Sequence, residues 1–221
     1  MVRGCSTANG HPAEIDKGLA ASVVTLGQDY PKAERVSGLL AGPEAPQMGL
    51  NGIIAVNEYI YSYAVVHNST NAYNVLVGRA KASDPAIFSS SEAYEFWAPA
   101  SKSWIQGIPD KKDASKFNME TAQPGGFACA TYGTVIYSNY LEKYMMFCDL
   151  YMNAITFYTS ANPEGPWSET YELMAGVSGY YGAMVHPSFS PNGSHKGQFP
   201  SMPFFFFLFL EKVGCSPRDF S

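Results

Sequence analysis

The chain has 221 residues, of which 15% are charged and 14% are aromatic, and it carries a net charge of -5. Its longest basic run is Lys111-Lys112, which argues against a nucleic-acid partner, because phosphate binding needs clustered lysines and arginines. The most apolar run, Pro203 to Leu210, is far shorter than the ~20 residues of a membrane-spanning helix, so no membrane partner is expected.

The amino-terminal segment of residues 1–40 lacks the apolar core of a signal peptide, and we interpret it as a leading segment or a partial repeat unit. The triplets "NST" at Asn68 and "NGS" at Asn192 both fit the N-glycosylation pattern, which is typical of secreted proteins. We therefore expect an extracellular parent protein, although this chain shows no signal peptide.

The cysteine pattern gives no support for a metal site. The four cysteines form no C-x-x-C pair, so no metal is predicted, and we expect Cys129 and Cys148 to be small buried apolar residues. No phosphate loop, dinucleotide fingerprint, G-x-S-x-G elbow or H-E-x-x-H motif occurs, so no cofactor is predicted.

The first part of the chain alternates apolar and polar residues with the period of β-strands. We predict a strand at Tyr59 to His67, a turn, a returning strand at Tyr73 to Ser83, and a third strand at Ala93 to Trp104. The polar segment from Gln106 to Gly126 is rich in turn-forming residues and is predicted to be a long, solvated loop that includes Asp110, Asp113 and Glu120.

The pattern then restarts. We predict a hairpin over Tyr132 to Leu150 with its turn near "NYLEK", a strand at Ala154 to Pro163 and an outer strand at Trp167 to Gly176. In the connection "NPEGPW", the two prolines fix φ on either side of Gly165, which permits a sharp turn. We expect Trp167 to cover the outer edge of its sheet, far from any central pocket.

Three segments begin alike, which indicates an internal repeat. "NGIIAVN" from Asn51, "YGTVIYS" from Tyr132 and "YGAMVHP" from Tyr181 each have Gly in second place before a β-forming run. A repeated unit of about fifty residues with four strands is typical of a β-propeller blade. The alternative is a β-sandwich whose hairpins look alike by chance.

The sequence therefore predicts an all-β fold, a β-propeller of the five-bladed type that is incomplete, with about two full blades plus partial ones. The blades would occupy residues 41–193. Residues 194–221 match neither earlier cycle, and one hypothesis is that this tail is not native to the domain.

The segments "YSNYLEKYMMF" and "ITFYTSANPEGPWSETYEL" resemble a family of secreted five-bladed propellers, domain-of-unknown-function family 4185, and the similarity extends over Gly49 to Asn192. The related arabinanase-like glycosidases share the Gly-Pro-Trp turn. This resemblance implies a carbohydrate-active protein, similar to glycoside hydrolases, that acts on or binds furanose-containing polysaccharide. The implied partner is a polysaccharide or an oligosaccharide.

Such hydrolases use a pair of carboxylates, one as the acid and one as the nucleophile or base. No Asp or Glu of this chain matches the family's acid pair, so whether the chain is an enzyme stays open. Asp149 is the candidate for a catalytic carboxylate. The alternative for Asp149, at the end of a strand, is that it accepts backbone N–H bonds in a turn.

Candidate ligand-binding residues follow from the repeat, because ligands of propellers usually bind where the innermost strands begin. Asn51, Tyr132 and Tyr181 would occupy equivalent positions on this rim, although for the two tyrosines packing in the inner core is the alternative that we favour. His186 could line the central channel, or could be a structural hydrogen-bonding residue.

Two further turns are expected to open toward the same face. They add His67, Asn153 and Tyr151, whose ring could stack on a sugar. Two rival hypotheses remain beside glycoside hydrolysis: a non-catalytic propeller that binds sugar or protein, and a truncated gene product without activity, whose open strand edges would favour aggregation.

Overall fold

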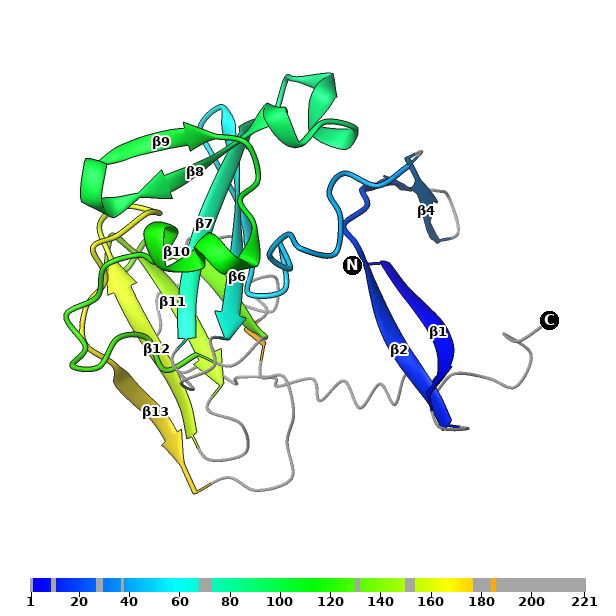
Figure 1. Ribbon diagram of the computed structural model, residues 1–221. Helices are drawn as coiled ribbons and strands as arrows, with labels where there is room; N and C mark the ends of the chain where they lie inside the picture. Colours follow the sequence, from blue (N-terminus) through cyan, green and yellow to red (C-terminus); the bar gives the residue numbers. More distant parts are fainter. Residues whose placement is uncertain are drawn as a thin grey trace.

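The computed structural model describes residues 2–8, 11–26, 30–36, 38–67, 73–129, 132–149, 154–176 and 184–185, and these form an all-β protein made of antiparallel sheets (Figure 1). Thirteen strands and four short 3-10 helices succeed one another in the order β1 (Val2–Ala8), β2 (His11–Gly18), β3 (Ser22–Leu26), β4 (Pro31–Arg35), β5 (Ile53–Val56), β6 (Tyr59–His67), β7 (Tyr73–Lys81), η1 (Pro85–Phe88), η2 (Ser91–Ala93), β8 (Tyr94–Ala98), η3 (Pro99–Ser101), β9 (Ser103–Gln106), η4 (Lys111–Phe117), β10 (Gly133–Ser138), β11 (Lys143–Asp149), β12 (Ala154–Ser160) and β13 (Tyr171–Ala175).

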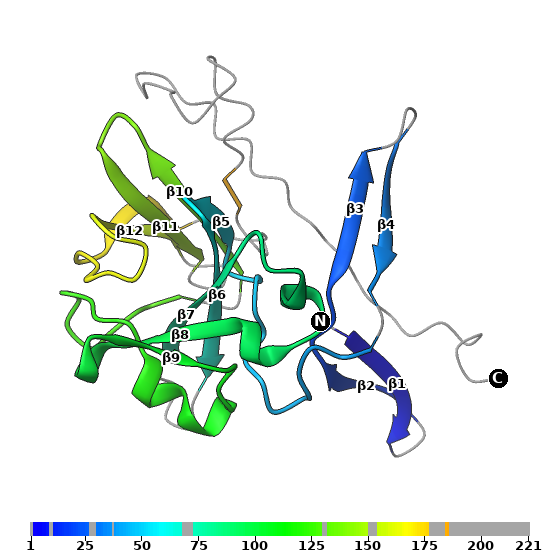
Figure 2. The same ribbon diagram turned by 90° about the horizontal axis from the view of Figure 1, so that it is seen from above.

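Two larger sheets carry the core. The first sheet has the order β5-β6-β7-β8-β9 and the second sheet the order β10-β11-β12-β13, so each is a meander in which consecutive strands pair. The hairpins β1-β2 and β3-β4 lie apart from these two sheets in both views (Figure 2). The predicted restart of the strand pattern after the polar segment is therefore confirmed for the first two cycles.

The β6-β7 hairpin follows the alternation of the sequence. It pairs from Tyr59 with Lys81 to His67 with Tyr73, and its middle residues are buried on both faces. One face packs on the second sheet, and the other packs on η4 and Phe96 of β8.

The predicted third strand at Ala93 to Trp104 is wrong in one respect, because it is two strands. Pro99 has no N–H for a ladder, and Lys102 adopts a left-handed conformation with φ of 49°, so the chain reverses between β8 and β9. Trp97 and Trp104 then face each other across this hairpin, and the first sheet gains a fifth strand.

The segment after β9, predicted as a solvated loop, is instead largely ordered against the two sheets. Residues 111–117 form η4, and the Asn118 side chain accepts a hydrogen bond of 2.8 Å from the Val75 N–H. Met119 and Phe127 are buried between the sheets. Asp113 matches the expectation in part, since it lies in this segment paired with the exposed Lys116.

The two sheets share one hydrophobic core. Tyr63 of β6 and Tyr158 of β12 are fully buried in it, together with Met146 of β11. The Tyr63 hydroxyl donates a 2.9 Å hydrogen bond to the Pro163 carbonyl, and the Tyr158 hydroxyl accepts one of 2.8 Å from Ala128. Each ring thus spans from its own sheet to a connecting segment.

The position predicted for Trp167 is wrong, although its burial is as expected. Trp167 is 2% exposed and lies in the core between the two sheets, edge-on to Tyr63 with ring centroids 6.4 Å apart. Its backbone N–H donates to the Glu120 carbonyl, so the turn before β13 is fastened to the segment that links the sheets. Gly165 has a φ of 96°, as the turn requires.

Cys129 and Cys148 are buried, as expected, but they are not separate thiols, because they form a disulfide. Cys148 lies in β11 and Cys129 in the segment that precedes β10, so the bond ties the linking segment to the second sheet. A lone buried cysteine and a paired one have the same sequence signal, and only the fold brings these two together.

Candidate functional site

The innermost strands of the two sheets, β5 and β10, are in contact. Gly52, just before β5, has a φ of 126°, and a Cβ there would lie 2.7 Å from the backbone nitrogen of Val135. At Gly133 a Cβ would collide with the Phe147 carbonyl and lie 2.8 Å from the Asn51 Oδ1. Gly52 is thus required where the inner strands approach each other, and Gly133 where β10 lies against its neighbour β11 and the Asn51 side chain.

The strand directions bring four of the predicted site residues to one end of the two sheets, which we call the rim. Asn51 precedes β5, Tyr132 precedes β10, and His67 and Asp149 end β6 and β11. The common end follows from the antiparallel order, because a strand that starts at the rim is followed by one that ends there.

Asn51 and Tyr132 differ in their access to a ligand. Asn51 is fully buried beside Gly133, whereas Tyr132 is half-buried directly before β10. For Asp149 the structure describes the backbone only. Ligand binding by these residues stays a prediction, and Tyr151, Asn153, Tyr181 and His186 lie outside the described residues.

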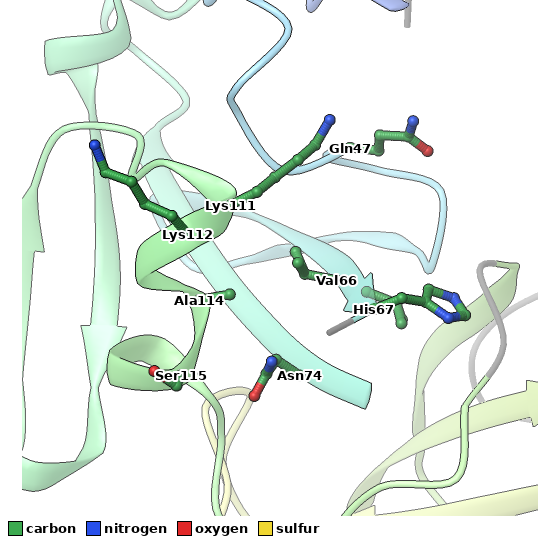
Figure 3. Close-up of a pocket in the computed structure, with 9 residues that line it drawn as sticks. Gln47, Val66, His67, Asn74, Lys111, Lys112, Ala114 and Ser115 are labelled. Carbon is green, nitrogen blue, oxygen red and sulfur yellow. The ribbon is translucent and has the colours of Figure 1, made fainter. Parts of the chain in front are cut away.

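A pocket opens beside the rim, on the face of the β6-β7 hairpin that η4 covers (Figure 3). Its volume is about 570 Å³. Strands β6 and β7, the 3-10 helix η4 and the segment before β5 supply the lining residues, which are Gln47, Val65, Val66, His67, Asn74, Lys111, Lys112, Ala114 and Ser115.

The pocket combines an apolar wall with carboxamide, imidazole and hydroxyl groups. Val66 and Asn74 are cross-strand neighbours, and Asn74 is only 8% exposed. The exposed His67 ring lies edge-on to the Tyr73 ring, with centroids 4.5 Å apart, which orients the imidazole at the pocket edge. Figure 3 shows Asn74 on β7 between Ser115 of η4 and His67 of β6.

The charged groups of the pocket are held by neighbouring groups. The Lys111 ammonium donates a 2.7 Å hydrogen bond to the Pro43 carbonyl. The Lys112 ammonium lies 2.9 Å from an Asp110 carboxylate oxygen, and this contact raises the pKa of Lys112 above its ordinary value. No carboxylate is among the residues that line the pocket.

Of the pocket residues, the sequence singled out His67 as a candidate. It missed Asn74, Gln47 and Ser115. The one signal for Asn74 was a polar residue inside the strongly apolar run "YNVLV", where a buried face would otherwise require an apolar side chain.

An aromatic cluster at the opposite end of β6 has a structural role. The Arg79 guanidinium lies 4.3 Å from the Tyr59 ring centre and 3.9 Å from that of Trp104, and it contacts a Glu95 oxygen at 2.6 Å. Burial acts to lower the pKa of Arg79, but hydrogen bonds to Tyr61 and Glu95 outweigh it and raise the pKa. With rings on two sides and a carboxylate beside it, Arg79 holds the outer strands of the first sheet together.

Among the described residues, no group of three or more His, Cys, Asp or Glu side chains is placed to hold a metal ion. Within the same residues, no helix is long and apolar enough to cross a membrane.

Comparison with solved structures finds a similar fold. A protein from Bacteroides ovatus, described as a putative hydrolase, matches with a TM-score of 0.54 and 18% identity, over 87% of this chain and 52% of its own length. The chain therefore spans about half the length of that protein, and the similarity concerns the fold.

Two glycoside hydrolase family 62 α-L-arabinofuranosidases show weaker similarity, from which we draw no conclusion. The Coprinopsis cinerea catalytic domain has a TM-score of 0.36 and 12% identity over 60% of this chain and 33% of its own. The Podospora anserina enzyme, in complex with cellotriose, has a TM-score of 0.34 and 14% identity over 58% of this chain and 32% of its own length. No model of a known protein family and no curated protein sequence matches the chain.

Proposed function

We propose that the chain is part of a secreted, carbohydrate-active β-propeller of the five-bladed type, similar to family 4185, that acts on or binds furanose-containing polysaccharide. The observation that carries this proposal is the contact of β5 with β10 at the inner edges of two successive meanders. Sheets that meet along their innermost strands are arranged like neighbouring blades around an axis.

Two findings support the proposal. The fold is shared with half of the Bacteroides ovatus protein, whose name describes a hydrolase. The Cys129–Cys148 disulfide is consistent with secretion, because disulfides persist mainly in oxidising compartments.

The rim is the proposed ligand-binding face, with Asn51, Tyr132 and Asp149 on described strands and loops. Tyr151, Tyr181 and His186 remain proposed members of this face. Of the rim residues named here, Asp149 alone carries a carboxylate, whereas glycoside hydrolysis uses two. This favours binding as the activity of this chain, with hydrolysis as the second candidate.

Two assays on the purified chain test the proposal. Calorimetric titration with arabinotriose measures binding, and the release of reducing sugar from arabinan measures hydrolysis. We expect arabinotriose to bind. If hydrolysis occurs, Asp149→Asn should abolish it while binding persists, because this change removes a carboxylate and keeps the shape. No binding to arabinotriose or to other furanose-containing oligosaccharides would contradict the proposal.

A further inference from the structure

The pocket between the β6-β7 hairpin and η4 is separate from the inner strands of the rim. Asn74 and Val66 point to the face of the first sheet that packs with Phe96 and Ala114, whereas the residues facing the second sheet belong to the other core. A ligand in the pocket would therefore contact the middle strands of the first sheet and η4, away from the contact of β5 with β10.

The Asn74 carboxamide is the strongest indication of a ligand. Asn74 is 8% exposed overall, and its carboxamide lines the pocket, where solvent reaches it. Water in the pocket satisfies these donor and acceptor atoms, and a ligand that displaces the water must reproduce its hydrogen bonds. The hydroxyl groups of a sugar can do so.

The other lining groups fit a sugar ring. A carboxamide offers both donors and an acceptor, so Asn74 and Gln47 can bond hydroxyl groups that themselves donate and accept. Ser115 adds a hydroxyl, and Val66 and Ala114 provide an apolar surface for the carbon-bound hydrogens of a ring. The volume, about 570 Å³, lies in the range of small-molecule sites.

The two lysines of the pocket are engaged by neighbouring groups. The Lys111 ammonium donates to the Pro43 carbonyl and the Lys112 ammonium pairs with the Asp110 carboxylate, so we assign ligand binding to the uncharged side chains of Asn74 and Gln47. Among the described lining residues there is no Asp or Glu, so the pair of carboxylates that glycoside hydrolysis uses is not found there.

We propose that this pocket is a second carbohydrate site, next to the rim at His67 but away from the inner strands β5 and β10, that binds one neutral sugar ring of a polysaccharide chain through Asn74 and Gln47 without cleaving it. The class of ligand rests on the proposed function, whereas the location rests on the pocket itself.

The test is calorimetric titration of the full chain with arabinotriose, using Asn74→Ala and Gln47→Ala as pocket variants. We expect each variant to weaken binding about tenfold, the effect of one or two lost hydrogen bonds. Gln106→Ala removes an exposed carboxamide on β9 and is the matched control, which should bind like the unchanged protein. Gln47 is outside every strand, so its variant keeps the test valid if Asn74→Ala fails to fold.

The outcomes separate this inference from the proposed function. Binding that both pocket variants leave unchanged, but that Tyr132→Ala weakens, would overturn the second site and retain carbohydrate binding at the rim. Absence of binding in the unchanged protein would overturn both. The proposal of a neutral ligand would be overturned if trigalacturonic acid bound more tightly than arabinotriose and Asn74→Ala removed this affinity.

Discussion

The two faces of the β6-β7 hairpin are packed in different ways. Toward the second sheet, Tyr63 and its neighbours form a core with large aromatic rings, tyrosine hydroxyls bonded to backbone groups, and a disulfide. Toward η4, a smaller apolar cluster ends at a pocket with Asn74. The same two strands thus carry a face that stabilises the fold and a face on which Asn74 opens into a pocket.

The largest expected effect is at the core between the sheets. Trp167→Ala should lower the free energy of unfolding by about 3–5 kcal/mol, because it removes a fully buried ring and leaves a cavity beside Tyr63. Urea unfolding followed by far-UV circular dichroism measures this loss. A loss below about 1 kcal/mol would show that the ring is not packed between the sheets.

The second-largest loss of stability is expected from removing the disulfide. Replacing both Cys129 and Cys148 by Ser should lower the free energy of unfolding by about 2–4 kcal/mol, since the bond closes a short loop in the unfolded chain. The same urea experiment, repeated with a reducing agent on the unchanged protein, should give a loss of similar size. Stability that responds to neither change would show that the cysteines are not bonded.

A smaller effect, with a pH signature, is expected at Tyr63. Burial and, next, the nearby Glu164 raise the pKa of the Tyr63 hydroxyl well above its ordinary value of 10.0. Above pH 10.0 the folded state therefore retains a proton that the unfolded state loses. The contribution of this hydroxyl to the free energy of unfolding is fully present below pH 10.0 and decreases as the pH rises above it.

Tyr63→Phe should reduce the free energy of unfolding by about 1 kcal/mol at neutral pH, through the lost bond to the Pro163 carbonyl, and should make the alkaline decrease shallower. Urea unfolding at pH 8 and at pH 10.5 measures both effects. Equal alkaline slopes in the two proteins would contradict burial of this hydroxyl.

The sequence predicts the elements whose apolar residues alternate, and it predicts less where distant segments meet. The β6-β7 and β10-β11 hairpins follow their alternation and turn residues. By contrast, the position of Trp167 depends on Tyr63, which lies in the other sheet and far away in the sequence. The division of Ala93 to Trp104 into two strands depends on a single left-handed residue, Lys102.

The site follows the same rule. His67 was recognisable as a polar residue at a strand end, and the repeat placed Asn51 and Tyr132 at the same end as His67. The pocket was not predictable, because η4 comes from a polar segment without apolar periodicity, and its packing against β7 creates the space beside Asn74. The repeated glycine was visible in the sequence, but the close contacts that require it, with β10 at Gly52 and with β11 and Asn51 at Gly133, needed the structure.

The most direct test of the contrast between the two faces is to measure the free energy of unfolding and arabinotriose affinity of Asn74→Ala in parallel. We predict a change in the free energy of unfolding within about 0.5–1 kcal/mol, because no hydrogen bond from described residues is lost, and an affinity about tenfold weaker. An unchanged affinity together with a loss of stability of several kcal/mol would contradict the account, because Asn74 would then belong to the core.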